Sequence, residues 1–154
     1  MNTNETLAEV LNDLVKINHD RVKGYEKAGN QVNTGDVDLK IVFHRMAEQS
    51  RYFINELSQE VLKLEANPAN TTTIQGKIYR AWMDVQSAFS GNCRNALLKS
   101  CEFGEEAAQR AYDEALASSV EMDTAVRQLM ASHKMALKKS HDEIRLMRNM
   151  QVAG

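Results

Sequence analysis

The amino-acid sequence predicts an all-α protein, an antiparallel four-helix bundle in which a long crossover with a short extra helix joins two helical hairpins. Helix breakers are rare, since the 154 residues include only one proline and seven glycines. Aromatic residues make up 6% of the chain and charged residues 26%, a balance that suits a helical protein better than a β-sandwich or barrel. Four long segments carry apolar residues at alternating spacings of three and four. A chain of this length fits one domain, residues 1–154, with one core.

The first two helices are expected at about 5–29 and 37–64. Each carries a seam of residues on the face that meets its neighbours. The seam of the first helix is Leu7, Leu11, Leu14, Asn18, Arg21, Tyr25 and Ala28. The seam of the second is Leu39, Val42, Phe43, Met46, Phe53, Leu57, Val61 and Leu64. Gly29-Asn30 and Thr34-Gly35 break the chain between the two helices, and Asp36 is placed to cap the second.

The last two long helices are expected at about 93–116 and 123–150, and a short helix at about 74–89 precedes them. Residues 67–73, with the sequence NPANTTT, form the one plainly non-helical stretch. The connection between the hairpins, about 65–92, is long enough to travel the length of the bundle and to start the third long helix parallel to the second. One long crossover of this kind is typical of ferritin-like bundles, which makes the predicted fold ferritin-like.

Composition and charge exclude several classes of partner. The formal net charge of −2 is too balanced to indicate a nucleic acid or an anionic membrane. The chain has neither a run of about 18 apolar residues that could span a membrane nor the pattern of a signal peptide at its start. Cys93 and Cys101 would lie roughly 12 Å apart on one helix, too far for a disulfide. Because free thiols suit a reducing compartment, the expected location is the cytoplasm.

The motif that would make such a bundle an oxidase or an iron store is present only in fragments. Carboxylate-bridged di-iron bundles take one Glu from each of two helices and Glu-x-x-His from each of the other two. The spacing matters because residues i and i+3 share one face of a helix. Here the second helix offers Glu48-x-x-Arg51, and the fourth offers Lys138-x-x-His141. The cations Arg51 and Lys138 would repel a metal ion at these positions.

Alignment of the two hairpins places a set of polar side chains near one level of the bundle. We interpret this set as a degenerate di-iron site that has become a salt-bridged polar core layer, in which Arg51 and Lys138 pair with Glu105 and Glu102. The members of the layer are Asn18, Glu48, Arg51, Glu102, Glu105 and Lys138. On this interpretation the protein needs no cofactor.

A reduced metal site is the alternative interpretation. Glu102 or Glu105, together with His133 or His141, would hold one ion, and carboxylate with imidazole suits Fe, Mn or Zn. Two ligands bind an ion weakly, so this site would need a second chain, and a homodimer is the expected assembly. No catalytic residue is assigned, because a cysteine on a seam of small residues, as Cys101 is, is usually an inert buried side chain.

Several short motifs occur in a distinctive order and spacing over about residues 7–148. They are Leu11-Asn12-Asp13-Leu14 with Gly24-Tyr25-Glu26, Arg51 with Phe53, Arg80 with Trp82, Gly104-Glu105-Glu106 with Tyr112, and His141 with Ile144. Together they resemble an uncharacterised bacterial family of four-helix-bundle proteins in the ferritin-like superfamily, a domain of unknown function. The resemblance implies the fold and a bacterial, soluble setting. Members of the superfamily bind iron through the Glu and Glu-x-x-His set, from which this chain departs at Arg51 and Lys138.

Two functional hypotheses follow. The first is a non-catalytic, stress-associated bundle protein whose ancestral metal site has been replaced by a salt-bridged layer. The second is a metal-dependent oxidase or iron-handling protein that uses the reduced carboxylate and histidine site. Neither hypothesis involves a nucleic acid or a membrane as a partner.

Overall fold

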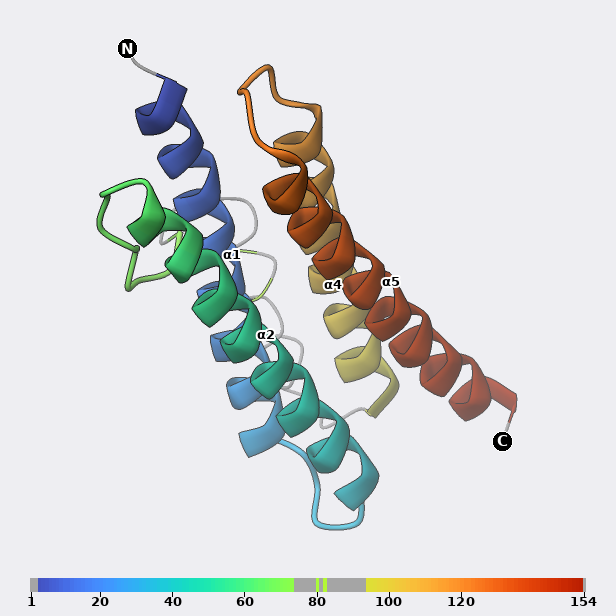
Figure 1. Ribbon diagram of the computed structural model, residues 1–154. Helices are drawn as coiled ribbons and strands as arrows, with labels where there is room; N and C mark the ends of the chain where they lie inside the picture. Colours follow the sequence, from blue (N-terminus) through green and yellow to red (C-terminus); the bar gives the residue numbers. More distant parts are fainter. Residues whose placement is uncertain (1–2, 74–79, 81, 83–93, 154) are drawn as a thin grey trace.

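The computed structural model describes residues 3–73, 80, 82 and 94–153, and Figure 1 shows long helices joined by short connections in this part of the chain. The long helices are α1 (Thr3–Asn30), α2 (Val37–Lys63), α4 (Arg94–Ala117) and α5 (Thr124–Ala153). The predicted all-α bundle is therefore confirmed. The short helix expected at about 74–89 lies outside the described residues, except for Arg80 and Trp82, which are both helical.

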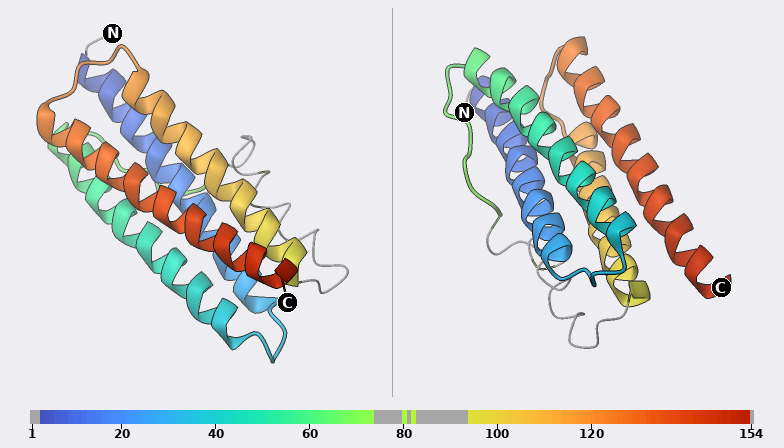
Figure 2. Two further views of the ribbon diagram at one scale, coloured as in Figure 1. Left: turned by 90° about the vertical axis from the view of Figure 1, so that its right-hand side faces the viewer. Right: turned by 90° about the horizontal axis from the view of Figure 1, so that it is seen from below.

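The helices form two antiparallel hairpins that lie side by side, α1 with α2 and α4 with α5 (Figures 1 and 2). The hairpins meet mainly along α1 and α4, whereas α2 and α5 approach each other over a shorter length. Helix α4 runs parallel to α2, as expected for a crossover that travels the length of the bundle (Figure 2). No helix in the described part of the chain combines the length and the apolar character needed to cross a membrane.

Charged side chains at the helix ends connect the hairpins. Asp36 stands at the N-cap of α2 as expected, but its side chain makes no capping hydrogen bond. Its carboxylate instead accepts a hydrogen bond from Arg94 Nη1 at 2.8 Å, and Arg94 also donates to Asp38 at 2.5 and 3.0 Å. The start of α4 is therefore tied to the start of α2. Helix α5, in contrast, has an ordinary cap, since Asp123 Oδ1 accepts from the Val126 amide at 2.9 Å.

The apolar interior consists of two clusters separated by buried polar side chains. The cluster packed around the first half of α1 includes Leu11, Leu14, Phe53, Leu57, Tyr112 and Met130. The cluster packed around its second half includes Tyr25, Phe43, Met46, Trp82, Leu98 and Ile144. Asn18, Arg21, Ser50 and Glu105 fall between the two clusters along their helices, and all four are almost completely buried. The bundle therefore has a layer of buried polar side chains in its interior, of which the sequence prediction named Asn18 and Glu105 but not Arg21 or Ser50.

The beginning of the crossover is fastened to α1 by side-chain hydrogen bonds. Asn12 donates to the Asn67 carbonyl at 3.0 Å and accepts from the Ala69 amide at 2.8 Å. Two turns further along α1, Asp20 accepts from the backbone amide of Thr73 at 3.1 Å and from its hydroxyl at 2.6 Å. These bonds hold the chain against α1 at Asn67, Ala69 and Thr73.

Trp82 lies fully buried against the backbones of α1 and α4. A Cβ atom built on Gly24 would lie 2.3 Å from Trp82 Cε3, and one built on Gly104 would lie 2.8 Å from Trp82 Cε2. The ring also packs against Tyr25, with 4.9 Å between the ring centroids. Both helices therefore need a residue without a side chain at these positions, because the indole occupies the space.

Candidate functional site

A fully buried ion pair joins α1 to α4 at the centre of the bundle. The side chains of Arg21 and Glu105 both have an exposed fraction of 0%. Arg21 Nε donates to Glu105 Oε1 at 2.6 Å, and Arg21 Nη2 donates to Glu105 Oε2 at 3.3 Å. Two parallel contacts of this kind are the strongest arrangement of a guanidinium and a carboxylate. Because an unpaired buried charge is very costly, each partner depends on the other.

The remaining polar atoms of the pair are satisfied by α1 and α2. Arg21 Nη1 donates to Ser50 Oγ at 2.9 Å and to the Met46 carbonyl at 3.2 Å. The Tyr25 hydroxyl donates to Glu105 Oε1 at 2.8 Å. Sequence reasoning placed Arg21 on the seam of the first helix but did not assign it to the polar layer. Its position on that seam, three residues after Asn18, was the signal that could have identified it.

Burial and charge shift the pKa values of three groups at this centre, Arg21, Tyr25 and Cys101. Burial alone would lower the pKa of the Arg21 guanidinium, but the adjacent Glu105 raises it above its ordinary value. Burial, followed by the negative charge of Glu105, raises the pKa of the Tyr25 hydroxyl well above its ordinary value. The same two causes raise the pKa of the Cys101 thiol well above its ordinary value. A thiol held in its protonated form is a poor nucleophile.

A chain of hydrogen bonds continues from this centre to the surface. Ser50 Oγ donates to Asn18 Oδ1 at 2.9 Å, and Asn18 Nδ2 donates to the Tyr112 hydroxyl at 2.9 Å. Tyr112 lies 2.9 Å from His133 Nδ1, and His133 Nε2 lies 2.8 Å from Glu56 Oε1. Since burial lowers the pKa of His133, the neutral ring fits best, with Tyr112 donating to Nδ1 and Nε2–H donating to Glu56. Both ring nitrogens of this candidate metal ligand are therefore already engaged.

The predicted pairing of Arg51 with Glu105 is wrong. Arg51 is 39% exposed and forms ion pairs with Glu26 of α1 and with Glu48, which is itself 54% exposed. The residue of α2 that faces the interior at this level is Ser50. One step along a helix rotates the side chain by about 100° and two steps by about 200°, which turns Arg51 and Glu48, respectively, away from the layer.

The predicted pairing of Lys138 with Glu102 is wrong for the same geometric reason. Leu137 is the buried neighbour on α5, and Lys138 is 67% exposed and pairs with Asp142 one turn further on. Glu102 receives its cation from another turn of α5, where Arg148 Nε donates to Glu102 Oε2 at 2.7 Å. Glu102 is nevertheless largely buried, as expected for a member of a polar layer, with 11% of its side chain exposed.

Glu102, Glu106 and His141 form a second polar group between α4 and α5, here called the α4–α5 cluster. His141 Nε2 lies 3.0 Å from Glu106 Oε2 and 3.8 Å from Glu102 Oε1, and one ligand atom from each residue lies within 4.8 Å of the others. Burial would lower the pKa of His141, but hydrogen bonds to Asp142 and Glu106 raise it above its ordinary value. Glu106 was not predicted, although its position four residues after Glu102 places both carboxylates on one helix face.

Of the four candidate metal ligands, the structure brings only Glu102 and His141 together. Glu105 lies at the central ion pair and His133 in the hydrogen-bonded chain. A ferritin-like metal pair needs carboxylates and histidines from four helices around one space. Among the residues that the structure describes, the central layer offers the one carboxylate of Glu105, with both oxygens bound by Arg21. The residues at the centre therefore do not fit a metal pair.

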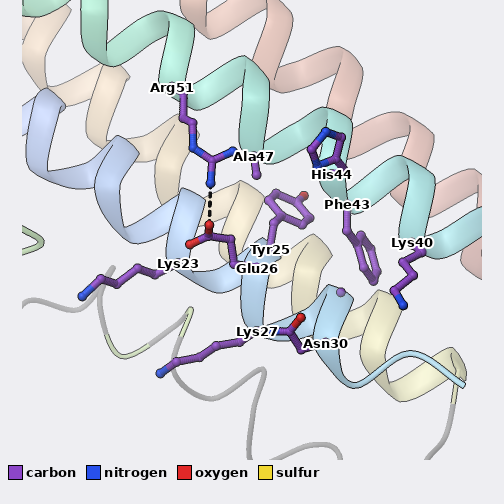
Figure 3. Close-up of a pocket in the computed structure, with 11 residues that line it drawn as sticks. Lys23, Tyr25, Glu26, Lys27, Asn30, Lys40, Phe43, His44, Ala47 and Arg51 are labelled. Atoms are coloured by element: carbon purple, nitrogen blue, oxygen red, sulfur yellow. Dashed lines mark hydrogen bonds and ion pairs between the residues drawn. The ribbon is translucent and has the colours of Figure 1, made fainter.

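A pocket of about 690 Å³ opens along the groove between α1 and α2 (Figure 3). Its rim is rich in cations, with Lys23 and Lys27 contributed by α1 and Lys40 and Arg51 by α2. Glu26 also lines the pocket and is paired with Arg51, as the dashed line in Figure 3 shows. The pocket lies on the outer side of the first hairpin, away from the α4–α5 cluster.

The helical arrangement defines the class of protein first, a ferritin-like four-helix bundle. Residues 6–118 match the family described as a domain of unknown function, DUF2383, and the chain belongs to this family. The fold is similar to that of a mutant of Mycobacterium smegmatis Dps1, with a TM-score of 0.82 over 95% of this chain and 97% of that chain. The sequence identity of 14% makes this a likeness of fold, and the predicted ferritin-like class is confirmed. No curated protein sequence matches the chain.

Proposed function

We propose that this protein is a non-catalytic, ferritin-like bundle in which a salt-bridged layer takes the place of the interior metal pair. One observation carries the proposal, the completely buried Arg21 guanidinium bound to both oxygens of Glu105. A divalent cation placed beside Glu105 would have to displace this guanidinium or lie against it in a medium of low dielectric constant. Either change is strongly unfavourable, because buried like charges repel and an unpaired guanidinium cannot lose its charge.

The proposal retains three expectations from the sequence. The protein is stress-associated, it acts in the cytoplasm, and its assembly is a homodimer without a nucleic acid or a membrane as partner. The two cysteines, which cannot bridge each other on one helix, support the cytoplasm, and the balanced charge of −2 supports the expectation that neither a nucleic acid nor a membrane is a partner. Light scattering of the purified chain measures the assembly directly.

A second candidate function, metal handling or metal-dependent oxidation, is favoured by the α4–α5 cluster. Two carboxylates and one imidazole with ligand atoms within 4.8 Å suit Zn, Mn or Fe, and three protein ligands would leave a position for water or substrate. Arg148 opposes this use, because it holds Glu102 through two contacts of 2.7 and 3.4 Å. An ion would have to replace that guanidinium.

Metal analysis combined with thermal melting separates the two candidates. Protein purified from cells supplied with iron and manganese should hold no tightly bound ion, and added Fe, Mn or Zn should leave its melting temperature unchanged. If the second candidate is correct, ions raise the melting temperature by mass action, and the effect disappears in His141→Ala and Glu106→Gln. Glu143→Gln is the matched control, since Glu143 lies on α5 and pairs with Arg45 outside the cluster. A metal-induced rise that these two variants abolish and the control retains overturns the first proposal.

A further inference from the structure

The hydrogen-bonded chain that joins the central ion pair to the surface runs in one direction. At its inner end the Arg21 guanidinium can only donate, and it donates to Ser50 Oγ at 2.9 Å. At its outer end the Glu56 carboxylate, when ionised, can only accept, and it lies 2.8 Å from His133 Nε2. The links between these two ends therefore have to donate outwards, from the centre towards Glu56.

The middle of the chain satisfies this requirement only while His133 is neutral. Tyr112 accepts from Asn18 Nδ2 at 2.9 Å, and its own hydroxyl proton points to His133 Nδ1, also at 2.9 Å. A neutral ring with its proton on Nε2 offers Nδ1 as the acceptor that this hydroxyl needs. A protonated ring donates from both nitrogens, so the Tyr112 proton would lose its acceptor. Because a buried donor without a partner is costly, the charge of His133 is coupled to the direction of the chain.

Asn18 provides the point at which the chain can reverse. If its amide turns over, Oδ1 accepts from the Tyr112 hydroxyl and Nδ2 donates to Ser50 Oγ. Ser50 already accepts from Arg21 Nη1, so its own proton has to find another acceptor. The Met46 carbonyl, one turn earlier on α2, is the acceptor that a helical serine reaches. Since this carbonyl now accepts from Arg21 Nη1 at 3.2 Å, the reversal changes the hydrogen bonds of the guanidinium.

The groups that face His133 set the balance between its neutral and charged forms. Helix α2 supplies the Glu56 carboxylate and the Phe53 ring, which stacks on the imidazole with 3.9 Å between the ring centroids. Helix α4 supplies the Tyr112 hydroxyl, and α1 is linked to the ring through Asn18. Burial lowers the pKa of His133 and Glu56 raises it, and burial is the larger of the two effects.

The next charges on the adjoining helices are paired. Lys134 follows His133 on α5 and forms an ion pair with Asp113 of α4. Arg21 of α1 is bound by Glu105 of α4. Paired charges have a weak net field, so the contacts of the ring itself dominate its behaviour.

We propose that His133 is a pH-sensitive switch that acts on the centre of the bundle. Protonation of its ring reverses the chain at Asn18 and changes the hydrogen bonds of the Arg21 guanidinium. While the ring is neutral the present direction is preferred, because the turned amide would give up its bond of 2.9 Å to the Leu14 carbonyl. The switch uses no member of the α4–α5 cluster, so it is independent of whether a metal ion binds there.

NMR spectroscopy of the full chain between about pH 5 and pH 8, with a chelator present, tests the proposal. The imidazole signals report the charge of His133, and the side-chain N–H signals of Asn18 and Arg21 report the direction of the chain. All samples carry Asp20→Asn, because the Asp20 carboxyl, next to Arg21 in the sequence, has a pKa raised to about 6 by burial. The neutral ring of His133 should carry its proton on Nε2, and the signals of Asn18 and Arg21 should shift with the same midpoint as those of His133.

Two variants separate a connected chain from independent titrations. Tyr112→Phe removes the connecting hydroxyl and keeps the ring, so His133 should still titrate while the accompanying shift of the Arg21 signal is lost. Tyr52→Phe is the matched control, because it removes a hydroxyl from a tyrosine that is 63% exposed and should leave that shift unchanged. Glu56→Gln removes the carboxylate that raises the pKa of His133, so the midpoints of His133 and Arg21 should move to lower pH together.

Three results would overturn the proposal. The first is an Arg21 signal that does not follow the titration of His133 in the parent protein. The second is a shift that survives in Tyr112→Phe or disappears equally in Tyr52→Phe. The third is a midpoint of Arg21 that stays in place when Glu56→Gln moves that of His133, and this result does not depend on how well Tyr112→Phe folds.

Discussion

Replacing Arg21 with methionine removes the cation from the centre of the bundle and keeps an unbranched side chain that can fill much of the same space. Among the residues that the structure describes, Glu105 would then retain one donor, the Tyr25 hydroxyl at 2.8 Å. The Met46 carbonyl would lose the side-chain donor that it now has, whereas Ser50 would keep its bond to Asn18. The main cost is therefore an anion buried without its counterion.

The magnitude follows from the complete burial of both partners. Breaking such a pair by removing one charge costs about 3–5 kcal/mol, a large part of the roughly 5–15 kcal/mol that stabilises a whole domain. With a urea dependence of about 2 kcal/mol per molar, the unfolding midpoint of Arg21→Met should fall by about 2 M. Because a lone buried carboxylate takes up a proton more readily, this loss should shrink as the pH is lowered towards 4.

The double variant Arg21→Met/Glu105→Met completes the test, because it removes both charges and leaves an apolar layer. Buried ion pairs are often replaceable by apolar residues at little cost, so the double variant should lie within about 1–2 kcal/mol of the wild type. Arg45→Met is the exposed control. It breaks the pair with Glu143, in which Arg45 is 58% exposed, and should cost less than about 1 kcal/mol.

Urea unfolding at pH 7 and at pH 4, followed by circular dichroism, measures five proteins: the wild type, Arg21→Met, Glu105→Met, the double variant and Arg45→Met. The reasoning fails if Arg21→Met loses less than about 1 kcal/mol at pH 7, a size expected for an exposed pair. It also fails if the losses of the two single variants, Arg21→Met and Glu105→Met, simply add in the double variant, since residues in direct contact should show a large coupling energy.

Two further predictions concern the crossover. Gly24→Ala and Gly104→Ala would each drive a methyl group into Trp82 and should destabilise the fold by about 1–3 kcal/mol. Gly29→Ala, with nothing within 4 Å of the new atom, should be neutral or stabilising by up to about 1 kcal/mol in the same urea assay; equal losses at all three positions would contradict the packing. Burial raises the pKa of Asp20 to about 6, against 3.8 for the exposed group. The folded state therefore holds the extra proton, and stability should fall by up to roughly 3 kcal/mol as the pH rises from about 4 to 6. Asp20→Asn should remove this dependence, and an unchanged pH profile in that variant would count against it.

The positions of the helices could be predicted closely because their signals are local. The first helix was expected at about 5–29 and is Thr3–Asn30, and the second was expected at about 37–64 and is Val37–Lys63. Apolar spacing and helix breakers lie within the segment that they describe, so no knowledge of the neighbours is needed. Asp36 is the instructive exception. It stands at the expected cap position, but its carboxylate binds Arg94, which is far away in the sequence.

The sequence predicted that polar side chains would lie in the core, but it did not identify which cation pairs with Glu105. Asn18 and Glu105 are buried as expected, and Glu102 is almost so, but the cation that neutralises Glu105 is Arg21. The error at Arg51 arose from counting levels along the hairpin without fixing the rotation of the second helix. The height of a residue along the bundle axis changes by about 1.5 Å per residue, so an error of one residue hardly alters it. The direction in which the side chain points changes by about 100° per residue, so the same error turns the side chain away from the core.

The sequence by itself determined the ferritin-like class of this protein, its helical hairpins and the presence of polar residues within an otherwise apolar seam. These properties follow from periodicity and from helix breakers, which act over a few residues. Only the tertiary structure decided that Arg21 neutralises Glu105, that Glu106 joins Glu102 and His141, and that residues of α1 and α2 line one pocket. Such pairings depend on the relative rotation and register of packed helices, which are set by the interlocking of all their side chains at once.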